Sequence, residues 1–173
     1  AISKYIKETE PEAKIVFIGP CTAKKAEYNK PELNKYIDST MTFEELQALF
    51  DSRSIDITVL EKTELNNASC FGRIFARSGG LSEAVNQSIK EQKEDFTVVP
   101  EVCAGIDACR IALTKAEKGL LKDNFIEGMA CPGGCIGGPG CLTHSEQNRL
   151  KIDEYAKLSY ETSIRDAASQ LIK

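Results

Sequence analysis

The densest group of reactive side chains and glycines lies near residue 130. Cys131 and Cys135 are separated by Pro-Gly-Gly, and six of the twelve glycines fall between Gly128 and Gly140. A helix or strand would not tolerate so many glycines, so the pattern predicts an irregular loop that can approach a ligand closely. Thiolates are the usual ligands of iron–sulfur clusters, and N–H groups freed by such a loop can donate to cluster sulfurs. The alternative is a tight turn with two incidental thiols, but a turn needs only one or two glycines.

A second group of candidate residues follows an apolar segment near the N-terminus. The sequence GPCTAKKAE, residues 19–27, places Cys21, Lys24 and Glu27 three residues apart. Open α/β sheets bind ligands at the carboxyl ends of strands, where this segment would lie. Cys21 is therefore a candidate thiolate ligand, and Lys24 and Glu27 share a face if the segment is helical. A cation and a carboxylate beside a thiolate favour a redox site; the alternative is a solvated helix start.

The other cysteines and the single histidine narrow the chemistry. Seven cysteines in 173 residues are an odd number in a chain too large to need a disulfide framework, so we expect a reducing, cytoplasmic location. Cys70, Cys103 and Cys109 are interpreted as small buried hydrophobes. The roles of Cys141, close behind the glycine loop, and of His144 stay open. One histidine excludes a Ser–His–Asp assembly unless His144 is the base, and argues against histidine-rich zinc sites.

Composition excludes several classes of function. The chain carries 26 acidic and 22 basic residues, a net charge of −4, and it has no basic block, so nucleic acid is not an expected partner. No apolar run approaches the ~18–20 residues of a membrane span. The first residues are too charged for a secretory signal, whose apolar core runs ~7–15 residues. A chain of this length can bury roughly 70% of its unfolded surface as one domain or two small lobes.

The hydrophobic pattern alternates between strands and helices. Short apolar runs predict strands, the first of them buried, and one-sided apolar stripes predict helices. Thr42 and Glu45 have the spacing of a capping box at the start of one helix. The predicted strands are 13–19, 55–60, 96–102 and 125–129. Helices are predicted after residue 42, after residue 80 and over 107–118, where Gly119 ends the helix, and two more helices are predicted at the end of the chain. Residues 71–80 are predicted to form a loop. This alternation indicates an α/β fold with a mostly parallel sheet flanked by helices.

Three segments together resemble the iron-only (FeFe) hydrogenase family. GPCTAKKAE is similar to the family's MPCTAKK-x-E motif, and EGMACPGGCIGG to MACPGGCI-x-GG. FGRIFARSGGLSEAV, which lies between them, resembles the family's FG-x-TGG-x-x-EA segment. The resemblance runs from about Lys4 to His144, with the motifs in the family's order. It implies the C-terminal part of the H-cluster domain over residues 1–173, one lobe of the iron hydrogenase fold.

The resemblance also implies a cofactor and roles for individual residues. The family's H-cluster is a 4Fe–4S cube joined through a cysteine sulfur to a two-iron unit that carries carbon monoxide, cyanide and a dithiolate. Cys21, Cys131 and Cys135 match three of its four cysteine ligands, and Cys135 matches the bridge between cube and two-iron unit. The other matches are Lys24 with a lysine that donates to a cyanide, Glu27 with a proton-path carboxylate, and Met129 with a methionine packed beside the two irons.

The implied activity is reversible reduction of protons to hydrogen in a larger parent protein of an anaerobe. Expected partners are the missing N-terminal part of that protein and a ferredoxin-like electron donor or acceptor. The isolated chain is expected to be inactive, to hold an incomplete H-cluster or none, and to self-associate.

Three departures from the family pattern favour an alternative. The TSCCP motif, which supplies another cluster cysteine and a proton-shuttling thiol, does not occur here, nor do ferredoxin-like cysteine runs. Gly19 stands where the family has methionine. Gly138-Pro-Gly-Cys141 replaces Gly-Gly-Gln-Pro. The alternative function is therefore a hydrogen-sensing or non-catalytic iron–sulfur module of the same fold; a domain whose glycine loop binds a partner without a cluster is a third reading.

Overall fold

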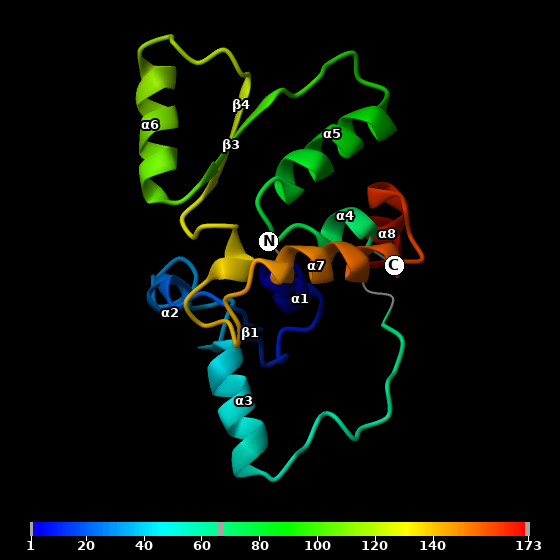
Figure 1. Cartoon of the computed structure of the whole chain (residues 1–173). Helices are drawn as coiled ribbons and strands as arrows, with labels where there is room; N and C mark the ends of the chain where they lie inside the picture. The colour runs from blue at the N-terminus through cyan, green and yellow to red at the C-terminus, as the bar shows by residue number, and fades with distance from the viewer. Residues whose placement is uncertain (1, 66–67, 172–173) are drawn as a thin grey trace. The chain divides into compact units, whose positions relative to one another are not determined.

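A computed structural model describes residues 2–65 and 68–171 of the chain (Figure 1). The chain divides into two compact units. Unit 1 comprises Ala1–Lys62 and Gly138–Thr143, and unit 2 comprises Thr63–Gly137 and His144–Lys173. Unit 1 is thus discontinuous, because six residues from the far side of the glycine loop belong to it. In the described residues, none of the helices is both long and apolar enough to cross a membrane.

Unit 1 is built on a short pair of parallel strands. Strands β1 (Val16–Ile18) and β2 (Ser39–Met41) pair with Val16 opposite Ser39 and Ile18 opposite Met41. The three helices of its described residues are α1 (Ile2–Thr9), α2 (Ala23–Glu27) and α3 (Phe43–Ser52). The capping box predicted for α3 is confirmed, because Thr42 Oγ1 accepts from Glu45 N at 3.2 Å and the Glu45 carboxylate accepts from Thr42 N at 2.9 Å.

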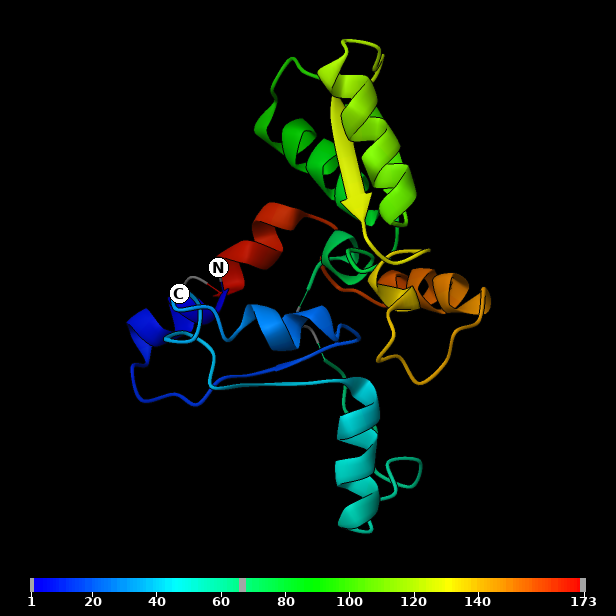
Figure 2. The same cartoon turned by 90° about the vertical axis from the view of Figure 1, so that its left-hand side faces the viewer.

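Unit 2 places two helices around a second parallel pair. Strands β3 (Pro100–Ala104) and β4 (Phe125–Met129) pair from Pro100–Phe125 to Ala104–Met129. Helices α5 (Gly80–Gln92) and α6 (Ile106–Glu117) lie on opposite sides of this pair (Figures 1 and 2). The remaining elements are α4 (Cys70–Arg73), the 3₁₀ turn η1 (Cys135–Gly137), α7 (Gln147–Lys157) and α8 (Ile164–Leu171).

The structure confirms the α/β class, the parallel pairing and several elements. Strand β4 has the predicted bounds, α6 ends before Gly119, whose φ is +66°, and two helices close the described chain. In the described residues the strands form two separate two-stranded sheets rather than one larger sheet.

Two strand predictions were wrong in placement or burial. Strand β3 begins at Pro100 rather than near residue 96, because the Asn86 and Asn124 side chains accept from the Val98 and Val99 amides at 3.0 and 2.8 Å. The first strand was expected to be buried, yet all three residues of β1 are exposed. Over the described residues its only partner strand is β2, and so short a pair leaves one face open.

Two further predictions failed because local polar contacts decide the structure. Residues 55–60 form no strand: the Asp56 carboxylate accepts from both the amide and the hydroxyl of Thr58, which makes a turn. Within the predicted loop 71–80, the first turn is helical as α4, because Ser69 Oγ accepts from Gly72 N at 3.2 Å and caps it.

Candidate functional site

The loop with Cys131 and Cys135 follows directly from strand β4. Cys131 is half-buried and Cys135 is exposed. Gly133 and Gly134 adopt φ of +78° and +93°, values that side-chain-bearing residues rarely take. The chain then folds back on itself, with Gly134 N donating to Cys131 O at 3.0 Å and η1 starting at Cys135. The sequence prediction of an irregular glycine loop is confirmed, with one 3₁₀ turn inside it.

This loop is fixed by backbone contacts to the segment before α5. Arg77 and Gly134 form an isolated antiparallel bridge, and Ser78 N donates to Gly133 O at 3.0 Å. A Cβ on Gly134 would lie 2.6 Å from Ser78 N and 2.8 Å from Ala76 O, closer than any real contact. Glycine is therefore required at position 134 for the two segments to approach. The backbone of Arg77 and Ser78 holds the loop between the two cysteines in place.

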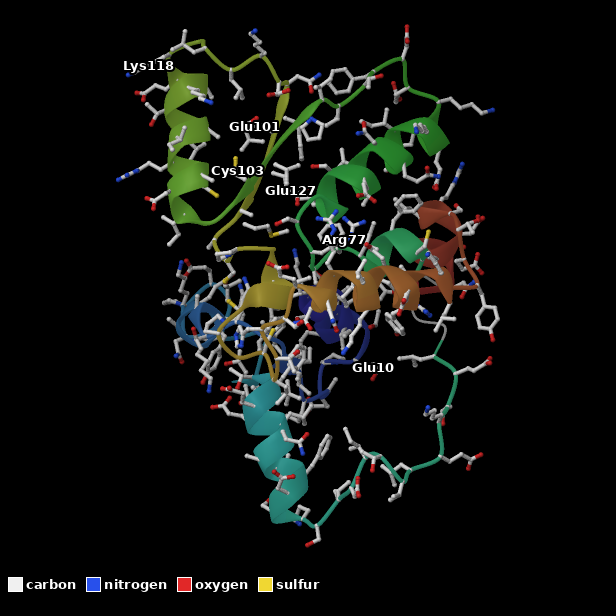
Figure 3. All side chains as sticks on the ribbon, in the orientation of Figure 1. Glu10, Arg77, Glu101, Cys103, Lys118 and Glu127 are labelled. Atoms are coloured by element: carbon white, nitrogen blue, oxygen red, sulfur yellow. The ribbon has the colours of Figure 1, made fainter. Side chains whose placement is uncertain are left out.

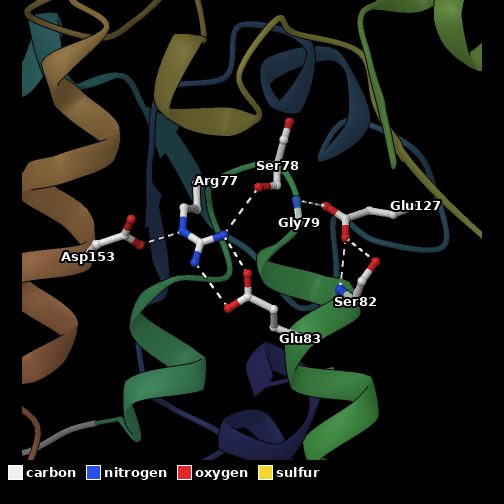
Figure 4. Close-up of polar contacts among 7 residues, drawn as sticks. All are labelled: Arg77, Ser78, Gly79, Ser82, Glu83, Glu127 and Asp153. Atoms are coloured by element: carbon white, nitrogen blue, oxygen red, sulfur yellow. Dashed lines mark hydrogen bonds and ion pairs between the residues drawn. The ribbon is translucent and has the colours of Figure 1, made fainter. Parts of the chain in front are cut away.

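Arg77 anchors that neighbouring segment with its buried side chain (Figure 4). Its guanidinium donates to both carboxylate oxygens of Glu83, at 3.0 and 3.1 Å, and through Nε to Asp153 at 2.6 Å. Burial alone would lower the pKa of Arg77, but the hydrogen bonds and charges of Glu83 and Asp153 raise it, so the group stays cationic. Helices α5 and α7 are thereby joined to the cysteine loop through one side chain.

Glu127, in the middle of β4, holds the same segment from the other side (Figures 3 and 4). Its side chain is fully buried. The carboxylate accepts from Gly79 N at 2.7 Å and from the Ser82 amide and hydroxyl at 2.8 and 2.5 Å. The acceptor sits at the N-terminus of α5, where the helix dipole favours negative charge. Strand β4, the cysteine loop and the start of α5 are therefore one connected structure.

Ser78 has a buried hydroxyl that the protein leaves unsatisfied. The residue is 8% exposed, and its Oγ has no hydrogen-bond partner among the described residues. The Ser78 amide donates to Gly133 O, and the Ser78 carbonyl accepts from Arg77 at 3.3 Å. Buried polar groups are nearly always paired, so an unsatisfied one beside the cysteine loop needs an explanation.

In unit 1, Cys21 lies between β1 and α2, as the sequence predicted, and is half-buried. Lys24 and Glu27 share one face of α2 and form an ion pair. The hydrogen bond from Lys24 is the main cause that lowers the pKa of Glu27, so this carboxylate is ionised at neutral pH. The Phe17 ring lies over Gly19, 2.9 Å from where a Cβ would be, and takes the space next to the position at which the family has methionine.

The segment Gly138–Thr143 belongs to unit 1 and packs against the region of Cys21. Gly140 N donates to Pro20 O at 3.1 Å, and a Cβ on Gly140 would lie 2.7 Å from Thr42 Cβ. Cys141 is buried. The residues that directly follow the cysteine loop in sequence therefore contact the residue that directly precedes Cys21.

The other candidates have simpler surroundings. Met129 ends β4, half-buried, and its carbonyl accepts from Gly105 N at 2.8 Å. Cys103 is buried, as predicted, and desolvation raises its pKa, with Cys109 contributing. Cys70 and Cys109 were also expected to be buried, but both are only half-buried. His144 is exposed and lines a pocket of about 550 Å³ with Ile136.

The candidate ligands are divided between the units. Cys21 lies in unit 1, and Cys131 and Cys135 lie in unit 2. Among the described residues of each unit taken alone, three or more His, Cys, Asp or Glu side chains do not gather as they would around a metal ion. Sequence reasoning found the cysteines but missed Arg77, Ser78 and Glu127. A charged residue inside an apolar strand, as at Glu127, was the one available signal.

Comparison with known proteins identifies the family. The family described as "Iron only hydrogenase large subunit, C-terminal domain" matches residues 1–139. The chain belongs to this family. Iron hydrogenase 1 of Clostridium pasteurianum is 29% identical over 80% of this chain and 30% of its own length. The periplasmic Fe hydrogenase large subunit of Nitratidesulfovibrio vulgaris is 31% identical over 88% of this chain and 45% of its own. The chain thus spans less than half of these relatives.

Solved structures agree on the fold. An FeFe hydrogenase studied for oxygen inactivation of its H cluster matches with a TM-score of 0.67 at 17% identity, over 99% of this chain and 60% of that one. An apo FeFe hydrogenase variant from Chlamydomonas reinhardtii matches with a TM-score of 0.58 at 18% identity, over 94% and 57%. These similarities establish an iron hydrogenase fold for the chain.

Proposed function

We propose that this chain is the C-terminal part of an H-cluster domain and serves reversible proton reduction in a larger protein. The observation that carries the proposal is the rigid cysteine loop: Cys131 and Cys135 flank a Gly-Gly turn that the backbone of Arg77 and Ser78 holds in place. An incidental turn would need neither the glycine at 134 nor a buried arginine behind it that pairs with two carboxylates. Family membership supplies the class of cofactor.

The residues present fit an iron–sulfur cofactor. Half-buried and exposed thiols are accessible to iron, and thiolates are the usual cluster ligands. The Ser78 hydroxyl is buried and unsatisfied, and the Ser78 amide donates to Gly133 O of the same loop. A sulfur atom of a cluster held there would be a hydrogen-bond acceptor for this hydroxyl. When bound, the H-cluster supplies the electron transfer and the hydrogen chemistry; the protein supplies ligands, hydrogen bonds and a site shielded from water.

Cys21 is the proposed third ligand. The hydrogen bond between Gly140 and Pro20 supports it, because it ties the chain just beyond the cysteine loop to the residue beside Cys21. By the family resemblance, Cys135 would bridge the cube and the two-iron unit. A fourth cysteine would come from the preceding part of the domain, together with a ferredoxin-like electron partner. A cytoplasmic location stays a prediction.

Lys24, Glu27 and Met129 are proposed to act around the cofactor. Lys24 donates to Glu27 in this structure, so its ammonium is already oriented and charged. Turning to an anionic cyanide ligand would exchange one charge-assisted hydrogen bond for another. Glu27, released from Lys24, would then be a proton acceptor on the same face, and Met129 would pack beside the irons.

The ligand set is tested by reconstituting the chain anaerobically with iron and sulfide. The unsubstituted chain is expected to bind a cluster, and Cys21→Ser, Cys131→Ser or Cys135→Ser to lower bound iron and sulfide by more than half. Cys70→Ser is the matched control, because Cys70 lies in α4, outside the proposed set. Equal iron content in Cys135→Ser and Cys70→Ser would contradict the assignment. The isolated chain should also lack carbonyl and cyanide infrared bands and evolve no hydrogen from reduced viologen.

Lys24→Ala tests the second group of residues in the protein that contains the rest of the domain. Loss of the ammonium is expected to lower two-iron occupancy and hydrogen turnover together, because the cyanide loses its donor. Lys25→Ala is the control, since Lys25 pairs instead with Glu45. If both variants behaved alike, a general charge effect would replace the proposed role.

A further inference from the structure

We propose that the Ser78 hydroxyl donates a hydrogen bond to a sulfur of the iron–sulfur cluster held by the Cys131–Cys135 loop and thereby raises the cluster's reduction potential. The proposal rests on the function proposed above. It assigns a tuning role to a residue that neither touches iron nor takes part in proton transfer.

The first support is the position of Ser78 against the loop. Its amide donates to Gly133 O at 3.0 Å, and its nitrogen would lie 2.6 Å from a Cβ on Gly134. Both glycines stand between the two candidate ligands. The backbone of Ser78 is therefore in contact with the centre of the cysteine loop, and its short side chain starts from there.

The second support is that the charged side chains on either side of Ser78 are already paired. Arg77 donates hydrogen bonds to Glu83 and Asp153, and Glu127 accepts hydrogen bonds from Gly79 and Ser82. The Ser78 hydroxyl has no such partner, and in Figure 4 it points away from the Arg77 guanidinium. A hydroxyl buried to this degree needs an acceptor, and the protein provides none within the described residues.

The third support is chemical. Cluster sulfurs become more negative on reduction, so a donor to one of them stabilises the reduced state, and such bonds help set cluster potentials. A neutral hydroxyl does this without adding charge. Arg77 and Glu127 hold the backbone of Ser78 and Gly79 from either side. The donor is therefore fixed before the cluster binds, which limits reorganisation.

Ser78→Ala separates this role from a structural one in two measurements. In the chain without iron, the variant should unfold at the same temperature or higher, because it removes an unsatisfied buried group. A clear loss of thermal stability would overturn the proposal, since the hydroxyl would then have a protein partner.

The second measurement is potentiometric titration of the reconstituted chain, followed by electron paramagnetic resonance. Ser78→Ala should lower the reduced-to-oxidised ratio about tenfold at fixed potential, a shift of about 59 mV for one electron. Ser78→Thr keeps the hydroxyl and should stay near the unsubstituted chain; Ser88→Ala, in α5 where Ser88 accepts from Gln92, should not shift.

The outcomes separate the two proposals. An unchanged potential in Ser78→Ala, or equal shifts in Ser78→Ala and Ser78→Thr, would overturn the role of the hydroxyl and leave the ligand set intact. Failure of the unsubstituted chain to bind any cluster would overturn the ligand set and this inference with it.

Discussion

At the scale of single residues, Gly133 and Gly134 form a matched pair. Both have positive φ, but only Gly134 has backbone atoms where a Cβ would be; around Gly133 nothing lies within 4 Å. Gly133→Ala should therefore cost about 1 kcal/mol of backbone strain, whereas Gly134→Ala must also separate the loop from Ser78. We expect Gly134→Ala to lose bound iron on reconstitution and Gly133→Ala to keep most of it. Equal iron retention would show that the bridge to Arg77 does not hold the loop.

The residues that sequence could and could not reveal differ in where their partners lie. Cys131 and Cys135 were predicted from the glycine cluster around them, and Cys21 from its place at the end of an apolar run. Arg77 and Glu127 depend on partners far away in sequence, such as Asp153 for Arg77 and Ser82 for Glu127. No local pattern contains those contacts, and Ser78 is notable only because a contact is missing.

At the scale of elements, helix α8 is held to α5 by one carboxylate. Glu91 accepts from the amides of Ile164 and Arg165 at 2.9 and 3.0 Å and from the Ser163 hydroxyl at 3.2 Å. The Arg165 amide, the Gln87 side chain and the Ile164 amide, in that order of effect, lower the pKa of Glu91 from its ordinary 4.5 to about 2. An acidic group at a helix N-terminus is stabilising only while it is ionised.

This arrangement predicts that α8 loosens in acid. Because the folded pKa lies below the unfolded one, the contribution is complete above about pH 4.5 and is lost as pH falls toward 2. Protection of the α8 amides against hydrogen exchange should fall over that range. Glu91→Gln should lower it at neutral pH about fivefold, as for a lost cap of ~1 kcal/mol. Glu94→Gln is the control; identical exchange in both variants would contradict the role of Glu91.

Element predictions succeeded where the hydrophobic pattern and the end signals agreed. Helix α6 with Gly119 and helix α3 with its capping box had both, and β4 kept the bounds of its apolar run. The element predictions failed where a polar side chain accepts a hydrogen bond from a backbone amide, as Asp56 does from Thr58 and Asn86 from Val98. An apolar run states which residues prefer burial, but it does not state whether a strand partner is at hand, which is why residues 55–60 are irregular.

At the scale of the whole molecule, the described surface carries many large apolar side chains. Val59 and Leu60 are 78% and 57% exposed, and all of β1 is exposed. Apolar patches of this kind rarely stay in water, so the isolated chain is expected to self-associate. Sedimentation velocity should show a mean mass that rises with concentration. Val59→Ser with Leu60→Ser should weaken the association without lowering the unfolding temperature, because neither side chain is buried; a monomer at every concentration would contradict this.

The discontinuity of unit 1 has a consequence for synthesis on the ribosome. Its first part ends at Lys62, but the strip that packs on Pro20 and Thr42 is Gly138–Thr143. About 75 residues must be translated between the two, which takes roughly 4–15 s at 5–20 residues per second. Throughout that interval Pro20 and Thr42 lack the neighbour that packs on them in the folded unit. Slow codons between residues 63 and 137 would lengthen this vulnerable period, so recovery of intact protein should depend on translation speed there more than elsewhere.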